Sequence, residues 1–250
     1  MNPTKAAFIT GASSGIGHAL ALELAARGYD LALAARRRET LVQLKDEIAR
    51  RYPERRVELF ALDVTRYGDV PAAVEAAAKT LGGISLVIAN AGVGSGRRVG
   101  DGGFEQDRQT IETNVLGAMA TLDAAVALCK RQGYGQLVAI SSVAAFRGLP
   151  TSAAYSASKA AIAVYADAVR AELHGTPIKV TTLYPGYIDT PINQMIKNRP
   201  FLVSVDKGAR IIADLIERGV QEATVPVFPW NLISRLVRVL PTATIARMAG

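Results

Sequence analysis

Thr10-Gly11-Ala12-Ser13-Ser14-Gly15-Ile16-Gly17 is the stretch that decides the fold. It follows an apolar, strand-like segment at residues 6–10 and opens a helix-like segment at residues 16–27. Its glycines let the backbone turn tightly and approach phosphate oxygens, and the free amides at a helix N-terminus attract anions. The Gly-x-x-x-Gly-x-Gly spacing is not the more familiar Gly-x-Gly-x-x-Gly. Because it opens the first strand–helix unit, we interpret it as a dinucleotide phosphate site rather than a plain turn.

The rest of the chain repeats this strand–helix pattern. Further strand-like segments are residues 30–35, 57–61, 84–89, 136–140, 178–183 and 223–227, and further helix-like segments are residues 39–51, 70–80, 106–130, 153–173 and 205–218. Apolar strands joined by helices predict a parallel sheet that is covered on both faces. We therefore expect an α/β fold, a doubly wound parallel sheet of the Rossmann type, whose ligands bind beyond the carboxyl ends of the strands.

The chain of 250 residues is expected to form a single domain, because it has no linker, internal repeat or low-complexity tract. The glycine-rich residues 92–103 follow the fourth strand, which suggests a loop beside the ligand crevice rather than a boundary. Residues 1–228 are expected to form the dinucleotide-binding domain with the active site built in. Residues 229–250 are expected to be a C-terminal amphipathic extension of the same domain.

Cysteine and histidine are too scarce for a disulfide or a metal site. Cys129 is the only cysteine and lies in an apolar helix-like segment, and His18 and His174 lack partners at metal-ligand spacing, so we expect no metal. Residues 1–5 lead almost directly into the first strand, without a signal peptide. No uninterrupted apolar stretch reaches membrane-spanning length. These features agree with a cytoplasmic protein.

The formal charge of +7 raises the question of nucleic acid. Arg50, Arg51, Arg55 and Arg56 fall at the end of a predicted helix and in the turn after it, where a solvated surface explains them. No zinc-finger or aromatic RNA-binding motif accompanies them. We expect no nucleic-acid partner.

Tyr155 and Lys159 stand four residues apart at the start of a predicted helix and share one of its faces. A free phenol titrates near pH ~10, and a neighbouring ammonium should lower that value. Ser141 and Ser142 end the preceding strand, where a hydroxyl can meet the phenol across the crevice, and Asn114 adds a polar group to an otherwise apolar helix. The set predicts a proton-transfer site.

These motifs together resemble the compact, single-domain branch of the short-chain dehydrogenase/reductase superfamily, over nearly the whole chain. In order they are residues 10–17, Asp63-Val64, Asn90-Ala91-Gly92, Asn114, Ser142, Tyr155 with Lys159, and Pro185-Gly186. The chain departs from the family at Ala89, where a second asparagine is frequent; Asn90 remains.

The resemblance implies an oxidoreductase that interconverts a carbonyl and an alcohol by hydride transfer with a nicotinamide cofactor. Tyr155 would be the general acid and base, and Lys159 would hold the cofactor ribose and lower the tyrosine pKa. Ser142, which has the family spacing that Ser141 lacks, would orient the substrate oxygen. Asn114 would support a water molecule leading to Lys159. Asp63 and Val64 would meet the adenine, Asn90 would stabilise the strand end, and Pro185, Gly186, Ile188 and Thr190 would frame the nicotinamide.

The end of the second strand indicates which nicotinamide cofactor binds. NAD-binding forms of this fold carry an acidic residue there, which binds the ribose diol. Here Ala35 takes that place and Arg36, Arg37 and Arg38 follow. A guanidinium binds phosphate through two parallel hydrogen bonds. We therefore expect NADP (NADPH), with Arg36 as the main phosphate contact and Arg37 as the second. Arg38 is expected to begin a solvated helix. The alternative is that all three arginines belong to that solvated helix.

The expected cofactor-binding residues are Gly11, Ser13, Ser14, Gly15, Ile16, Gly17, Arg36, Arg37, Asp63, Val64, Asn90, Ala91, Gly92, Tyr155, Lys159, Pro185, Gly186, Ile188 and Thr190. The candidate rim of the substrate pocket is apolar and consists of Val143, Phe146, Leu149, Tyr187, Met195, Ile196 and Phe201. If these residues line the pocket, they favour a hydrophobic carbonyl compound; they could instead pack against a partner subunit. Two alternatives remain: a dinucleotide-sensing protein without turnover, and an epimerase or dehydratase on the same fold.

A short amphipathic helix is predicted near the C-terminus. Leu232, Ile233, Leu236, Val237 and Leu240 fall at helical spacing on one face. Pro229 and Trp230 stand at its start and Pro241 at its end. Apolar residues beside arginines and a tryptophan suit weak, peripheral membrane contact. The alternatives are a subunit interface in a homo-oligomer and packing on the chain's own core.

Overall fold

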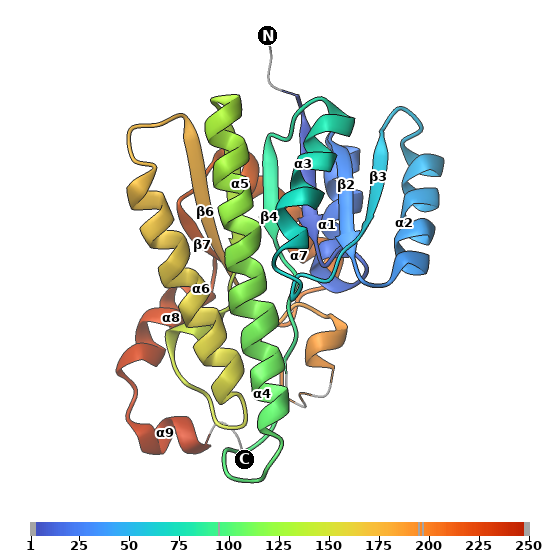
Figure 1. Cartoon of the computed structure of the whole chain (residues 1–250). Coiled ribbons are helices and arrows are strands. Elements are labelled where there is room, and N and C mark those ends of the chain that lie inside the picture. The colour runs from blue at the N-terminus through green and yellow to red at the C-terminus, as the bar shows by residue number, and fades with distance from the viewer. Residues whose placement is uncertain (1–3, 95, 195, 197, 248–250) are drawn as a thin grey trace.

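The computed structural model describes residues 4–94, 96–194, 196 and 198–247. In these residues, one parallel sheet contains β1 (Ala6–Thr10), β2 (Asp30–Ala35), β3 (Val57–Ala61), β4 (Leu86–Ala89), β5 (Gly135–Ile140), β6 (Ile178–Pro185) and β7 (Glu222–Val225). The strand order is β3-β2-β1-β4-β5-β6-β7, and the strands run downward in Figure 1. The predicted doubly wound α/β fold is confirmed.

The crevice follows from this order. β1 pairs with β2 on one side, where Ile9 lies opposite Leu33, and with β4 on the other, where Ile9 lies opposite Ile88. The chain therefore winds in opposite directions from β1, and the loops after β1 and β4 separate at the carboxyl edge of the sheet. This switch point is where ligands bind in open α/β sheets.

Helices cover both faces of the sheet (Figure 1). The helices are α1 (Gly15–Ala26), α2 (Arg38–Arg51), α3 (Asp69–Leu81), α4 (Phe104–Ile111), α5 (Ala118–Gln132), α6 (Ala153–Glu172), α7 (Val205–Arg218), α8 (Trp230–Val239) and α9 (Thr242–Arg247). Side chains alternate along a strand, so β1 sends Phe8 into the core under α3, α5 and α6 and Ile9 into the core under α1, α2 and α7. Two apolar cores thus hold the strand ends that carry the site.

The helix predicted over residues 106–130 is not continuous. A π-helical segment, Glu112–Gly117, separates α4 from α5 and contains Asn114. Such segments occur mostly as local insertions and often at functional sites. An added Cβ on Gly117 would lie 2.7 Å from Val64 Cγ2, so the backbone here packs directly against the residues that follow β3. The spacing of apolar residues in this stretch did not predict the break between α4 and α5.

The stretch Phe104–Gln132 also corrects an expectation about membrane-spanning length. Among the described residues, it is long and apolar enough to cross a membrane by length and composition. In this fold, 56% of its most apolar window is buried within the protein. It serves as a core helix that covers the sheet.

The C-terminal helix forms as predicted, but some residues of its apolar face are exposed and others are partly buried. Trp230 and Ile245 are buried, and α8 packs on the short 3₁₀ helix Val143–Phe146 and on β7. Leu232 and Leu236 are exposed, whereas Ile233, Val237 and Leu240 are partly buried. One side of α8 therefore packs on the chain itself. Trp230, expected as an interfacial residue, belongs to the protein interior instead.

Candidate active site

The phosphate turn is closed by Asn90. Its Nδ2 donates to the carbonyl oxygen of Thr10 at 2.9 Å. An added Cβ on Gly17 would lie 2.5 Å from that nitrogen and 2.5 Å from the Gly11 carbonyl oxygen. Gly11 itself has φ +69°, which favours glycine. The turn therefore needs glycine at both positions, and Asn90 holds it in shape.

Thr10 joins the two strand ends at the switch point. Its hydroxyl oxygen accepts hydrogen bonds from the backbone amides of Asn90 and Ala91 at 3.0 and 3.1 Å and donates to the Ile88 carbonyl at 3.3 Å. Ser13 and Ser14 follow after Gly11 and Ala12, and Ser14 precedes the first turn of α1. The amides of this helix end face the crevice that a dinucleotide needs.

Tyr155 and Ser142 meet on the other side of the crevice. The Ser142 hydroxyl donates to the Pro185 carbonyl at 3.3 Å and lies within hydrogen-bonding reach of the Tyr155 phenol. Burial raises the pKa of Tyr155, and the hydrogen bond with Ser142 only partly offsets this. The phenol therefore stays protonated at neutral pH in this structure and is available as a proton donor.

Lys159 lies behind the phenol. Its Nζ donates to the Ile140 carbonyl at 2.9 Å and stands 5.7 Å from the centroid of the Tyr155 ring. Burial lowers the pKa of Lys159 to about 8. The ammonium has three donors, and Ile140 is the one acceptor found among the described residues, so two donors remain for a ribose.

The electrostatics of the pair differ from the expectation. The sequence predicts that Lys159 lowers the pKa of Tyr155, whereas burial dominates here and raises it. The same burial lowers the pKa of Lys159 to about 8, so the ammonium persists at neutral pH and is lost only above about pH 8. Both shifts favour the neutral forms, as desolvation does.

Asn114 connects the loop after β4 to α6. Its Oδ1 accepts from the Val93 amide at 2.8 Å, and its Nδ2 donates to the Val93 carbonyl at 2.8 Å and to Ser158 Oγ at 3.0 Å. An added Cβ on Gly92 would lie 3.3 Å from Asn114 Oδ1 and 3.4 Å from Lys159 Nζ. Asn114 thus fixes the loop beside Lys159 through direct contacts, in addition to any water that it holds.

Arg37 is the arginine that reaches the phosphate turn. Its Nη2 donates to Ser14 Oγ at 2.8 Å and to Ser13 Oγ at 3.0 Å. Arg36 is exposed and lies near Asp63. Burial works to raise the pKa of Asp63, but hydrogen bonds from Thr65 and the charge of Arg36 lower it overall. Of the two arginines predicted to bind phosphate, Arg37 is therefore the one that contacts the turn, while Arg36 lies near Asp63.

The segment after β6 closes the opposite end of the crevice. Ile188 and Thr190 are buried, and an added Cβ on Gly15 would lie 3.4 Å from Thr190, so this segment reaches the phosphate turn. An added Cβ on Gly186 would lie 2.2 Å from Trp230 Nε1 and within 2.8 Å of two further atoms of the same five-membered ring. The Trp230 ring therefore lies against Gly186, one residue from the carbonyl that Ser142 binds.

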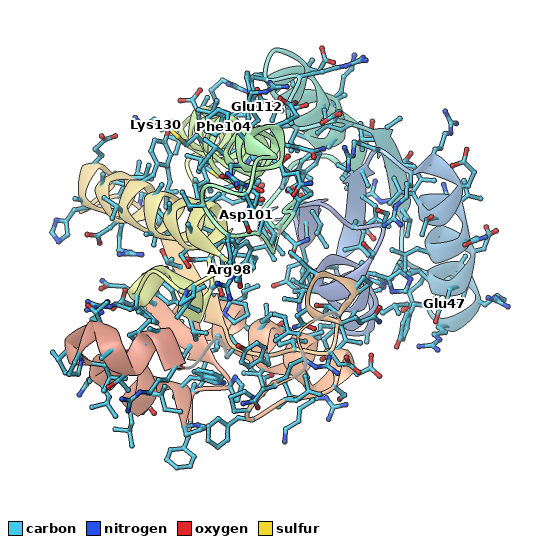
Figure 2. All side chains as sticks on the ribbon, turned by 90° about the horizontal axis from the view of Figure 1, so that it is seen from below. Glu47, Arg98, Asp101, Phe104, Glu112 and Lys130 are labelled. Atoms are coloured by element: carbon cyan, nitrogen blue, oxygen red, sulfur yellow. The ribbon has the colours of Figure 1, made fainter. Side chains whose placement is uncertain are left out.

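The aromatic members of the candidate rim pack on two different residues. Phe146 packs on Tyr184 with centroids 4.6 Å apart, and Tyr187 and Phe201 pack on Trp230 at 5.9 and 6.0 Å. Met195 lies outside the described residues, while Val143 and Leu149 are partly buried and Ile196 is exposed. Figure 2 shows Arg98 and Asp101, from the loop before α4, toward the middle of the molecule as seen from below.

Sequence reasoning missed two neighbours of the phenol. An added Cβ on Gly94 would lie 3.3 Å from Ile192 Cγ1 and 3.5 Å from Tyr155 Cδ2, so Gly94 borders both Ile192 and the ring of the proton donor. The sequence interpretation treats residues 92–96 as a flexible loop. The only feature of the sequence that could have indicated a role for Gly94 was its position shortly after a strand that ends at the crevice.

Known proteins resemble the chain over most of its length. The family model described as short chain dehydrogenase matches residues 5–200. An uncharacterized oxidoreductase of Mycobacterium tuberculosis is 40% identical over 243 residues, which cover 97% of this chain and 96% of that protein.

Two solved structures show the same fold. An alcohol dehydrogenase from Thermococcus sibiricus, complexed with 5-hydroxy-NADP, has TM-score 0.80 and 30% identity, covering 88% of this chain and 95% of its own. A short chain dehydrogenase/reductase from Burkholderia phymatum, in complex with NAD, has TM-score 0.84 and 23% identity, covering 94% and 92%. With the fold, the phosphate turn and these matches together, the chain belongs to the short-chain dehydrogenase/reductase family of oxidoreductases.

Proposed function

We propose that this protein is an NADP-dependent oxidoreductase that interconverts a ketone or aldehyde and the corresponding alcohol, with Tyr155 as the general acid and base. The observation that carries the proposal is the meeting of Tyr155, Ser142 and Lys159 beside Pro185, across the crevice from the phosphate turn. The crevice thus combines a dinucleotide cradle with a proton donor, and hydride chemistry needs both.

The residues present fit a nicotinamide dinucleotide. The turn around Gly11 and Gly17 is closely packed, because an added Cβ would clash with its neighbours, and the N-terminal amides of α1 that follow it would bind the pyrophosphate. Lys159 has donors for the ribose, and Pro185 to Thr190 frame the far end of the crevice. When bound, the cofactor supplies the hydride.

The proton comes from Tyr155 in the direction of carbonyl reduction. A carbonyl oxygen placed between Tyr155 and Ser142 would accept two hydrogen bonds, and the phenol proton would move to that oxygen as negative charge develops. Lys159 then stabilises the phenolate electrostatically from behind the ring. In alcohol oxidation the phenolate accepts the proton, and the same residues act in reverse.

The preference for NADP rests on the end of β2. Ala35 leaves no carboxylate to bind an unmodified ribose diol, while Arg37 already contacts Ser13 and Ser14 beside the turn. The similar structures contain either cofactor type: the Thermococcus enzyme is complexed with 5-hydroxy-NADP, and the Burkholderia protein with NAD. We therefore propose that Arg37, with Arg36 beside it, binds the 2′-phosphate.

The substrate proposed is a hydrophobic carbonyl compound or alcohol. Ile192 and the Tyr155 ring both lie next to Gly94, and Tyr187 and Phe201 each pack on Trp230. Apolar walls with a few placed polar groups are typical of small-molecule sites. The alcohol dehydrogenase from Thermococcus sibiricus supports the same reaction class by its name.

The test is a screen of ketones and aldehydes with purified protein, in which loss of reduced-nicotinamide absorbance is followed with NADPH and with NADH. We expect oxidation of NADPH that depends on the carbonyl compound and is slower with NADH. Tyr155→Phe keeps the ring and removes the proton donor, so it should lower turnover by about 10²–10⁴-fold. Near-normal reduction by this variant would overturn the assignment.

A further inference from the structure

The outer side of α8 is apolar and exposed. Phe228, Leu232, Leu236 and Val239 are 71%, 57%, 57% and 77% exposed. Phe228 lies in the turn before the helix, and the other three follow at helical spacing along one side. We call these four residues the α8 stripe. The opposite side of α8 carries the buried Trp230, so the stripe adds little to packing within this chain.

The stripe lies in a segment that has no acidic side chains. Glu222 is the last acidic residue of the chain, whereas Arg235, Arg238 and Arg247 come after it. Ion pairs among residues 4–94, 96–194, 196 and 198–247 involve none of these three arginines. Arg235 and Arg247 are exposed, and the Arg238 guanidinium lies 4.8 Å from the centroid of the Phe146 ring. The segment that carries the stripe is therefore cationic.

A second group of exposed apolar residues lies in the segment after β6, which packs on the start of α8. Ile192, Ile196, Phe201 and Leu202, from the segment after β6, are also exposed. The Phe201 ring packs edge-on against Trp230 at the start of α8, with centroids 6.0 Å apart. This segment therefore lies next to the start of the helix that carries the stripe.

The charge distribution decides between the possible occupants. If the stripe paired with the same stripe of a second copy about a two-fold axis, it would bring the arginines of both copies together without a carboxylate from this segment. An anionic lipid surface offers an apolar layer that would cover the stripe and fixed negative charges that would attract the arginines. Exposed apolar residues beside cations suit that boundary better than self-pairing.

We propose that the α8 stripe docks on the surface of an anionic lipid membrane. Phe228, Leu232, Leu236 and Val239 enter the boundary between headgroups and acyl chains, and Arg235 and Arg247 contact the headgroups. Because the helix has ten residues and the segment three arginines, the contact is peripheral and reversible. The proposal concerns the outer side of α8 and does not depend on the chemistry of the crevice.

The test is co-sedimentation of the full-length protein with phosphatidylcholine vesicles that contain or lack phosphatidylserine. Wild type should bind the vesicles with phosphatidylserine more tightly, and added salt should weaken that binding. Leu232→Ser/Leu236→Ser removes two stripe residues that the fold does not bury, so its partition onto these vesicles should fall by on the order of tenfold or more. Arg235→Gln should lower it by less.

The matched control is Val42→Ser/Val164→Ser, which removes two exposed apolar residues from α2 and α6. It should bind vesicles like wild type, and circular dichroism should show that all variants are folded. Light scattering on the same samples decides whether the stripe joins subunits. Equal binding to both vesicle types, unchanged binding by the leucine variant, or an oligomer that the leucine variant dissociates would each overturn the proposal.

Discussion

The two glycine-rich segments of this chain use glycine for opposite reasons. In residues 10–17, an added Cβ at Gly17 would come within 2.5 Å of Asn90 Nδ2 and of the Gly11 carbonyl oxygen. In residues 92–103, an added Cβ at Gly96 or Gly100 would meet no described atom within 4 Å. The first segment needs glycine because its neighbours leave no space for a side chain. In the middle of the second segment, a side chain at Gly96 or Gly100 would meet no described neighbour.

Gly94 qualifies this contrast. It belongs to the second segment, yet an added Cβ there would approach Ile192 and the Tyr155 ring. The first segment thus shapes the cofactor cradle, while the beginning of the second borders the proton donor. What a missing side chain would touch is therefore more informative than how many glycines a segment contains.

The largest effect is expected from Gly17→Ala. The Cβ would clash with backbone and with the Asn90 amide, so the turn must shift, at a cost of up to about 3 kcal/mol. NADPH affinity should then fall by on the order of a hundredfold in a calorimetric titration. Gly96→Ala is the matched control and should bind as wild type does. If both variants bind NADPH equally well, the contrast between the segments is lost.

Arg37→Ala tests whether the arginine that contacts the first segment contributes to NADPH binding. Removal of a charge-assisted phosphate contact costs roughly 1.5–3 kcal/mol, or about one to two decades of NADPH affinity. NADH affinity should change much less, so the ratio of the two dissociation constants is the quantity to measure. Arg36→Ala should change that ratio less than Arg37→Ala does. The reverse order would restore the ranking that the sequence gives.

The pH dependence of NADPH binding tests Lys159. Its pKa is lowered to about 8, so the ammonium is present below that pH and is lost as the pH rises through it. Because the ribose contact needs the ammonium, NADPH affinity should fall by up to about tenfold for each pH unit above this point. Lys159→Arg keeps its charge and should remove the alkaline decline. A decline that persists in this variant would assign the titration to another group.

The smallest effect is expected from Gly94→Ala. The added methyl group would stand 3.3 Å from Ile192 Cγ1 and 3.5 Å from Tyr155 Cδ2, a tight but yielding contact with side chains. We expect kcat/KM for a carbonyl compound to fall by no more than about fivefold, or about 1 kcal/mol, with NADPH affinity unchanged. A loss of NADPH affinity instead would place Gly94 in the cofactor cradle.

The sheet and the phosphate turn could be predicted because local sequence determines them. Apolar runs such as Leu31 to Ala35 are long enough to show a buried strand, and the turn stands directly after one. Tyr155 and Lys159 share a helix face by spacing alone. These features need no knowledge of distant contacts.

Other features could not be predicted because tertiary contacts decide them. The π-helical break at Asn114 depends on packing against Val64, far away in the sequence. Whether Arg36 or Arg37 turns toward Ser14 depends on where the chain leaves β2. Burial, which sets the direction of the Tyr155 pKa, also requires the assembled fold. The contact of Trp230 with Gly186 joins two segments that have no shared pattern.

The central claim is that a bound nicotinamide lies beside Gly186, within reach of Tyr155. Trp230 is the only tryptophan and its ring lies against Gly186, so its fluorescence reports on this point alone. Reduced nicotinamide absorbs where tryptophan emits. Titration with NADPH should therefore quench most of the Trp230 emission and produce nicotinamide emission, whereas oxidised NADP should do so far less. Trp230 emission that stays unchanged while calorimetry shows NADPH bound would contradict the claim.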